Sequence, residues 1–219
     1  FIDQYPQVED LAQAPLPEVL GLWSGLGYNR RAKWLKESAQ KIVSDFEGAV
    51  PQTIEDLVTL PGIGHNTAAA ICVYAFNTSE NFVETNIRTV FIYHLYSDKE
   101  IAVSDKEILS LQAKILEGGV NPREWYLALM DYGTYLKKNH RSITRKSHSY
   151  RKQSAFAGSV RQVRGAVLKL LLQSNAKKRS SIDIELAGYD KNLQNIALTQ
   201  LINEGFIVKD SKGRYALKK

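Results

Sequence analysis

Residues 60–76 read LPGIGHNTAAAICVYAF, and residues 82–90 read FVETNIRTV. The first stretch predicts a tight turn between two helices, because Gly62 and Gly64 permit backbone conformations that other residues rarely adopt. The second helix would begin near Asn66, where free backbone amides and the positive end of the helix dipole suit a phosphate. Such a turn holds a nucleic-acid backbone without reading base sequence. The same short pattern also fits an ordinary helix–helix turn, so the surrounding sequence has to decide.

The remainder of residues 1–136 predicts an all-α domain. Apolar residues recur at helical spacing on both sides of the turn, and Thr53 is placed to cap a short helix. Few stretches alternate as a strand would. We expect short helices within residues 11–22 and 34–46, where apolar residues recur at helical spacing, and helices over residues 54–59, 66–76, 86–96, 105–116 and 122–136.

Residues 159–219 predict a second, small α+β domain, so that the chain as a whole is mainly α. Helices over residues 160–172, 181–187 and 192–204 precede two strands, 206–210 and 214–217, which form a hairpin. Gly205 is placed to end the last of these helices. Three helices and a terminal hairpin indicate a winged helix, a fold that binds DNA in some proteins and other proteins elsewhere.

Charge is distributed unevenly along the 219 residues, whose net charge is +6. Residues 1–136 carry 10 Lys and Arg against 18 Asp and Glu, whereas residues 159–219 carry 12 against 5. Residues 137–158 contain 7 basic residues and no acidic one, and they read as a linker or loop between the two domains. A basic second half favours binding to a polyanion, although a solvated linker beside an ordinary basic domain has the same composition.

Cys72 is the only cysteine, so one chain can form neither an internal disulfide nor a four-thiolate metal site. No apolar run approaches the ~20 residues of a membrane span, and no signal peptide is visible. We therefore expect a reduced cytoplasmic protein, nucleoid-associated if bacterial, monomeric and without a membrane partner. Phe1 lies within an apparent helix, so we expect N-terminal helices that precede it.

The quoted stretches together resemble the helix–hairpin–helix (HhH-GPD) superfamily of base-excision DNA glycosylases, most of all the MutY-type adenine glycosylases and then endonuclease III. PQVEDLAQAPLPEVLGLWSGLGYNRRAKWL at residues 6–35 and ALMDYG at 128–133 agree with the same family. The resemblance covers roughly residues 1–136. It implies an enzyme that binds double-stranded DNA, flips a base out of the duplex and cleaves the bond between base and sugar.

The resemblance assigns the catalytic carboxylate to Glu84. The family has Asp at this position, so the carboxylate here stands one methylene further from the backbone. A carboxylate beneath the sugar would stabilise the positive charge that develops as the base leaves. Asn86 matches a family asparagine beside that carboxylate, although it could equally cap the helix that follows. We expect Asp131 to cap or brace the fold.

Asn66 distinguishes between two chemistries within the family. The endonuclease III branch has a lysine here, whose amine forms a Schiff base with the sugar. An asparagine cannot do so, and no lysine lies between Leu60 and Glu84. The sequence therefore predicts a monofunctional glycosylase, which releases the base with water and leaves the DNA backbone intact.

The resemblance also implies DNA contacts along the hairpin and at Tyr28, which could otherwise be a half-buried core residue. The basic segment after residue 136 adds three cationic candidates. The predicted DNA-binding residues are Tyr28, Leu60, Gly62, Ile63, Gly64, His65, Asn66, Thr67, Arg141, Arg145 and Lys146. The family's hairpin can hold a monovalent cation through carbonyls, which here would belong to Val58, Leu60 and Ile63.

The chain departs from the family's pattern at three points. Four cysteines that hold an iron–sulfur cluster usually follow the MDxG segment, but residues 136–154, LKKNHRSITRKSHSYRKQS, contain none. We therefore predict no cofactor, and we expect His140 and His148 to be solvated. The C-terminal domain does not resemble the MutY-type domain that reads 8-oxoguanine. The family's glutamate that protonates the departing purine would lie before Phe1.

The sequence predicts a base-excision repair glycosylase, with a mispaired adenine as the favoured base. A uracil or thymine mismatch glycosylase of the same superfamily is the first alternative. A non-catalytic DNA-binding module is the second, and a winged-helix transcription regulator is the third.

Overall fold

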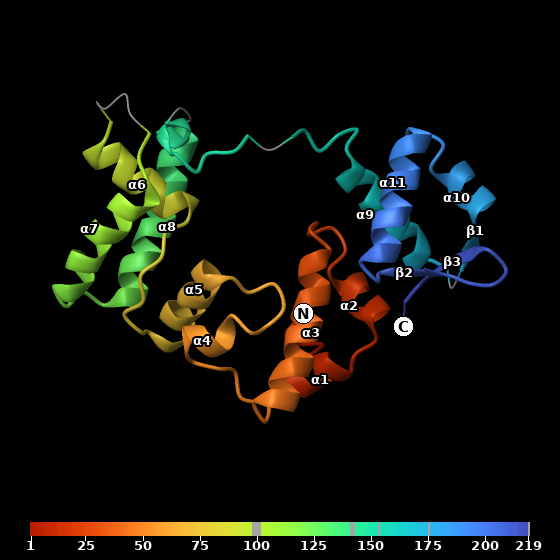
Figure 1. Cartoon of the computed structure of the whole chain (residues 1–219), viewed down its shortest axis with the longest axis horizontal. Coiled ribbons are helices and arrows are strands. Elements are labelled where there is room, and N and C mark those ends of the chain that lie inside the picture. Colours follow the sequence, from red (N-terminus) through yellow and green to blue (C-terminus); the bar gives the residue numbers. More distant parts are fainter. Residues whose placement is uncertain (98–101, 141–142, 153, 175, 219) are drawn as a thin grey trace. The chain divides into compact units, whose positions relative to one another are not determined.

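The computed structural model describes residues 1–97, 102–140, 143–152, 154–174 and 176–218. The chain divides into two compact units (Figure 1). The terminal unit combines Phe1–Val50 with Gln153–Lys219, and the central unit is Pro51–Lys152. As predicted, the described chain is mainly helical and carries one small antiparallel sheet near its C-terminal end.

The terminal unit is built from both ends of the sequence. Its helices are α1 (Val8–Gln13), α2 (Leu16–Leu22), α3 (Arg30–Asp45), α9 (Val160–Leu172), α10 (Arg179–Glu185) and α11 (Lys191–Asn203). Its strands are β1 (Lys177–Lys178), β2 (Ile207–Lys209) and β3 (Arg214–Leu217), which pair in the order β1-β3-β2.

One apolar core fills the terminal unit. Val19 and Ala32 from the N-terminal helices share it with Val163, Leu201 and Phe206 from the C-terminal segment, and all five are fully buried. An ion-paired cluster at Glu204 extends this packing. The N-terminal helices and the described C-terminal segment therefore fold around the same core, whereas the sequence analysis divided the chain at residues 136 and 158. That division stays a prediction.

The central unit holds the helix–hairpin–helix stretch. It contains α4 (Ile54–Leu57), α5 (His65–Phe76), α6 (Thr85–Leu95), α7 (Asp105–Glu117), α8 (Pro122–Asn139) and the 3₁₀ helix η1 (Ile143–Lys146). A second core, which includes Ile87, Ile92 and Tyr126, packs α6 against α7 and α8. In Figure 1, α6, α7 and α8 form one group, and α4 and α5 lie to one side of it.

Several local predictions are confirmed. The Thr53 hydroxyl caps α4 by accepting a 3.2 Å hydrogen bond from the Asp56 amide. Gly205 follows α11 with a φ of +72°, and β2 and β3 form the expected hairpin. The sequence missed β1, which has two residues and pairs with a strand 36 residues later at Lys178 and Arg214.

The segment predicted as a linker is structured in part. Lys137 and Lys138 continue α8, where a positive charge suits the negative end of the helix dipole. Beyond η1, Ser147 forms a parallel bridge with Val103. Among the residues that the structure describes, no helix has the length and apolar character needed to cross a membrane.

Candidate active site

The hairpin of the central unit exposes the backbone of two glycines, Gly62 and Gly64. Gly62 has a φ of +76°, a conformation that a side chain would strain, and the Ile63 amide donates to the Leu60 carbonyl at 3.2 Å. Gly64 precedes α5 and supplies no side-chain cap for the first amides of the helix. The exposed residues of this turn are Gly62, Gly64, His65, Asn66 and Thr67. An anion could therefore approach these amides from solvent.

Asn66 connects the hairpin to the segment that precedes Glu84. Its side-chain amide donates a 3.1 Å hydrogen bond to the carbonyl of Val83. Val83 is 2% exposed and belongs to the core of the central unit, so the hydrogen bond attaches Asn66 to this core. Asn66 occupies the position that the resemblance assigns to a lysine in the endonuclease III branch. In this chain its side chain makes a hydrogen bond within the protein.

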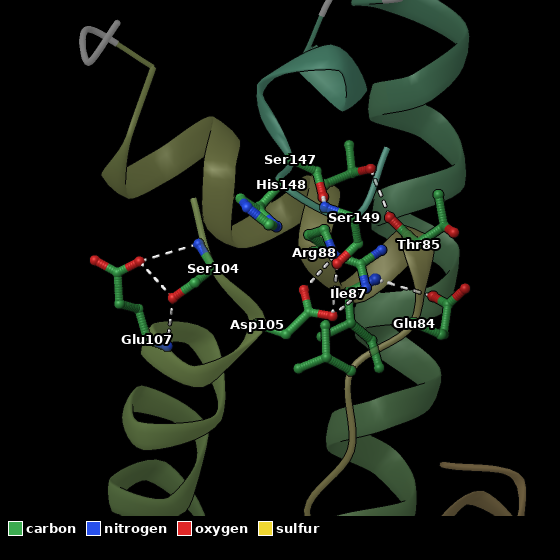
Figure 2. Close-up of polar contacts among 12 residues, drawn as sticks. Glu84, Thr85, Ile87, Arg88, Ser104, Asp105, Glu107, Ser147, His148 and Ser149 are labelled. Atoms are coloured by element: carbon green, nitrogen blue, oxygen red, sulfur yellow. Dashed lines mark hydrogen bonds and ion pairs between the residues drawn. The ribbon is translucent and has the colours of Figure 1, made fainter. Parts of the chain in front are cut away.

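Glu84 begins α6. Its carboxylate oxygen Oε1 accepts hydrogen bonds from the backbone amides of Asn86, at 2.5 Å, and Ile87, at 3.0 Å (Figure 2). The negative charge stands at the positive end of the helix dipole, which favours it. Within the described part of the chain, the other oxygen, Oε2, has no hydrogen-bond partner. One oxygen therefore orients the carboxylate and the second is free to face a ligand.

Asn86 lies in the first turn of α6 and does not cap it, so the capping alternative was wrong. The cap is Glu84, whose carboxylate accepts from the backbone amides of Asn86 and Ile87. Asn86 is 9% exposed, and its Nδ2 lies 3.6 Å from the Met130 sulfur. Its Oδ1 is buried and accepts no hydrogen bond from the described residues.

Gly133 explains why α8 can pass so close to the start of α6. A Cβ placed on Gly133 would lie 2.3 Å from the Asn86 carbonyl oxygen and 2.6 Å from its carbon, both backbone atoms. Real Cβ atoms do not approach backbone to this distance, so the glycine of ALMDYG allows the contact that supports Glu84. Asp131 of the same stretch is exposed in the middle of α8, so it caps no helix.

A buried phenol lies in the electrostatic field of Glu84. Burial first, and then the negative charge of Glu84, raise the pKa of Tyr74 to about 12. The hydroxyl is buried and has no hydrogen-bond partner among the described residues. Tyr74 therefore stays neutral and remains a proton donor across the physiological range.

A polar network that the sequence did not reveal includes Arg88 of α6. Arg88 Nε and Nη2 donate to the two Asp105 oxygens at 2.6 and 2.8 Å, and the Ser149 hydroxyl donates to the same carboxylate at 3.1 Å (Figure 2). The hydrogen bonds from Arg88 hold the pKa of the Asp105 carboxyl below its usual range. Three distant segments meet here, and only the folded chain shows it.

The other predicted DNA-binding residues are dispersed. Tyr28 belongs to the terminal unit, where it is 62% exposed and has a φ of +48°. Arg145 is exposed on η1, and the Lys146 ammonium donates to the Ser97 carbonyl. Arg141 lies outside the described residues. His140 and His148 are exposed as predicted, although the His140 ring also packs on Tyr93.

A model of the HhH-GPD superfamily of base excision DNA repair proteins matches residues 1–153. The chain belongs to this superfamily. The match confirms the resemblance seen in the hairpin and in FVETNIRTV, and it extends beyond both.

Relatives of this chain carry the name adenine DNA glycosylase. The one from Mycolicibacterium smegmatis is 31% identical over 233 residues, which cover 99% of this chain and 79% of the relative. The one from Homo sapiens is 32% identical over 136 residues, which cover 61% of this chain and 25% of the relative. The mycobacterial alignment includes residues 159–219, which the sequence analysis had set apart from the MutY-type pattern.

A solved structure, that of a thermostable thymine-DNA glycosylase, is also similar to this HhH-GPD chain. It has a TM-score of 0.50 and 28% sequence identity, and the match covers 61% of this chain and 62% of the other. The chain thus spans less than two thirds of that protein.

The residues present do not fit the iron–sulfur cluster that the HhH-GPD resemblance implies. A cluster of this kind needs four thiolates, whereas Cys72 is the only cysteine. Cys72 is buried on α5 with its sulfur 3.3 Å from the Gln52 carbonyl. The described residues contain no group of three or more His, Cys, Asp and Glu side chains suited to a metal ion. The carbonyl site at Val58, Leu60 and Ile63 stays a prediction.

Proposed function

We propose that this chain is a monofunctional DNA glycosylase that removes adenine from a mispair. Similarity to adenine DNA glycosylases over 99% of the chain supports the substrate. The single observation that carries the chemistry is the placement of Glu84, whose carboxylate is oriented at the start of α6 with Oε2 free. The Asn66–Val83 hydrogen bond ties this carboxylate to the hairpin.

In the proposed reaction, the flipped nucleotide lies with its sugar beside Glu84. The bond between C1′ of the sugar and N9 of adenine breaks, its electron pair stays with the base, and the sugar becomes cation-like. The Glu84 carboxylate stabilises this charge in a site whose dipoles are already oriented. Water then bonds to C1′ and loses a proton, while the departing base gains one.

Asn66 supports hydrolysis without strand cleavage. A bifunctional enzyme needs an amine that attacks C1′, and the Asn66 amide is not nucleophilic. It is also engaged with Val83. The DNA backbone should therefore stay intact after the base is released.

DNA binding in this proposal rests first on the exposed amides of the hairpin and then on basic side chains such as Arg145. Helix amides and arginines bind phosphates without reading the base sequence. We propose Tyr28, an exposed aromatic, as a stacking contact with the bases. The C-terminal helices and hairpin would add a winged-helix contact with the duplex.

A thymine glycosylase is the second candidate, because the solved thymine-DNA glycosylase is 28% identical over the matched region. Both candidates use the same carboxylate, so the base identity has to be measured. We would incubate the full chain with labelled duplexes that carry A opposite 8-oxoguanine, A opposite G, U opposite G and T opposite G.

Each duplex would be analysed with and without alkali. Cleavage of the adenine duplexes only after alkali supports the proposal. Cleavage of the T or U duplex instead supports the second candidate. Cleavage without alkali contradicts the role of Asn66, and tight binding without cleavage would identify a non-catalytic DNA-binding module.

A further inference from the structure

A pocket of about 380 Å³ lies in the central unit beside the first turns of α6. Ser147, Ser149, Tyr150 and Arg151 cover one side of it, and Figure 2 shows Ser147 and Ser149 near Thr85 and Arg88. The residues that line it are Thr85, Arg88, Thr89, Ile92, Lys137, Ser147, Ser149, Tyr150 and Arg151. Eight of these nine side chains are polar or charged, and none is acidic.

The wall that segment 147–151 provides is fixed by hydrogen bonds. The Val103 amide donates to the Lys146 carbonyl at 2.9 Å, and the His148 amide donates to the Val103 carbonyl at 3.1 Å. The Ser149 hydroxyl reaches Asp105 at 3.1 Å. Because these contacts hold the segment at both ends of the serine pair, the pocket is formed before any ligand arrives.

The pocket carries positive charge that the described residues do not neutralise. Arg88 is balanced by Asp105, as described above. Among the residues that the structure describes, Arg151 donates to backbone carbonyls alone, those of Tyr150 at 3.0 Å and His148 at 3.5 Å. Within the described residues, neither Lys137 nor Arg151 has an ion pair. Two cations therefore face a partly enclosed space without a counter-charge.

Hydroxyl groups add directional donors to this charge. The Ser147 oxygen accepts from the Ser149 amide at 3.1 Å, which leaves its own proton free to be donated. In the part of the chain that the structure describes, the hydroxyls of Thr85 and Tyr150 have no partner. Cations together with several hydroxyl donors suit a compact oxyanion, whose oxygens each need a donor. A metal cation would be repelled.

We propose that this pocket binds a phosphate-class oxyanion, supplied either by a DNA phosphodiester or as free phosphate. Lys137 and Arg151 provide the charge, and Thr85, Ser147 and Tyr150 provide hydrogen bonds. The site is separate from the hairpin amides and from Arg145. Binding of free phosphate does not depend on the proposed glycosylase function, whereas the phosphodiester source does.

Inorganic phosphate is the probe, titrated by calorimetry into the full chain at constant ionic strength set with sodium chloride. The pocket variant is Lys137→Gln with Arg151→Gln. The control is Lys138→Gln with Lys152→Gln, which removes the same two charges one residue away, from exposed side chains that do not line the pocket. Circular dichroism verifies that each variant is folded.

We expect saturable binding of one phosphate, weakened at least about tenfold in the pocket variant and less than about twofold in the control, since charge-assisted hydrogen bonds are the strong ones. Equal weakening in both variants would overturn the proposal, because diffuse surface charge would then explain the binding. Absence of saturable binding, together with equal affinity of both variants for a duplex, would overturn it too.

Duplex titrations distinguish the two sources. If the phosphate comes from DNA, the pocket variant loses duplex affinity beyond the loss in the control, and inorganic phosphate competes with the duplex. If the pocket takes free phosphate, the two variants bind the duplex equally while phosphate binding is still lost only in the pocket variant. Both results support an oxyanion site and assign its occupant.

Discussion

The side-chain amide of Asn66 donates to the backbone carbonyl of Val83 at 3.1 Å, across 17 residues of sequence. This hydrogen bond joins the first turn of α5, which follows the hairpin, to the residue before Glu84. The hydrogen bond thus fixes the position of the hairpin, proposed to bind the DNA backbone, relative to the Glu84 carboxylate, proposed to act on the sugar. This relative position matters for catalysis, because a displacement of about 1 Å can reduce the rate of a reaction by about 100-fold.

Replacement of Asn66 by Ala should therefore affect the rate more than the stability. The lost hydrogen bond costs about 1 kcal/mol of unfolding free energy. We expect a fall of about tenfold or more in the single-turnover rate of base release, since the carboxylate loses its link to the hairpin. Asn139→Ala removes the same kind of bond, 2.8 Å to the Tyr135 carbonyl, far along α8. If both variants lose the same activity, the Asn66–Val83 hydrogen bond has no specific role in catalysis.

Gly133→Ala should destabilise the central unit. The added methyl would lie 2.3 Å from the Asn86 carbonyl oxygen, so α6 and α8 must separate. Overpacking of this kind costs about 1–3 kcal/mol. Gly165→Ala in α9 is the control, because nothing lies within 4 Å of its Cβ, and there the helix gains about 0.5–1 kcal/mol. Thermal unfolding of both variants measures the contrast, and an unchanged Gly133→Ala protein would contradict the packing described here.

The stability of the terminal unit should depend on the ionisation of Glu204. Burial raises the pKa of this carboxyl, but hydrogen bonds and charges from Arg164 and Arg30 outweigh burial and lower it from 4.5 to about 2. The depressed folded pKa means that the stabilisation is complete above the unfolded pKa and is lost as the pH falls from 4.5 toward about 2. The shift corresponds to about 3 kcal/mol at neutral pH.

Urea unfolding of the wild type and Glu204→Gln tests this dependence. We expect the largest difference in unfolding free energy near neutral pH and a shrinking difference below pH 4.5. Glu185→Gln removes a more exposed ion pair of the same unit, that with Lys177, and should change stability by less than about 1 kcal/mol at every pH. A difference for Glu204→Gln that is constant with pH would refute the assignment.

Arg145→Ala should weaken duplex binding in a salt-dependent way. Arg145 is exposed on η1, and one phosphate contact contributes a slope of about 0.9 to the dependence of log Kd on log salt. We expect that slope to fall by about one when Arg145 is removed. Lys106→Ala, an exposed cation on α7, should leave the slope unchanged. Equal slopes for both variants would show that η1 does not contact DNA.

Local features of the fold followed from the sequence. Gly62 with its φ of +76° and Gly205 with its φ of +72° lie where the residue types required a turn and a helix end. The β2–β3 hairpin followed from alternation around Gly213. Each of these depends on a few neighbouring residues, so a single sequence contains enough information to predict them.

Contacts between distant segments could not be predicted in the same way. The shared core of the terminal unit brings Val19 together with Leu201, and no local pattern indicates that pairing. The network of Arg88, Asp105 and Ser149 likewise depends on three segments that meet only after folding. Residue 84 was found through the family resemblance, and its capping geometry became visible only in the structure.

The central claim is that Glu84 acts on the sugar, and Glu84→Gln tests it most directly. Gln keeps a carbonyl oxygen that can accept from the Asn86 and Ile87 amides, so the start of α6 survives while the negative charge is lost. Glu124→Gln, an exposed acid in the first turn of α8, is the matched control. Single-turnover release of adenine opposite 8-oxoguanine and duplex affinity are measured for both. We expect Glu84→Gln to lose detectable base release, to bind the duplex at least as tightly as the wild type, and to differ sharply from an active Glu124→Gln. Base release by Glu84→Gln at the wild-type rate would contradict the account.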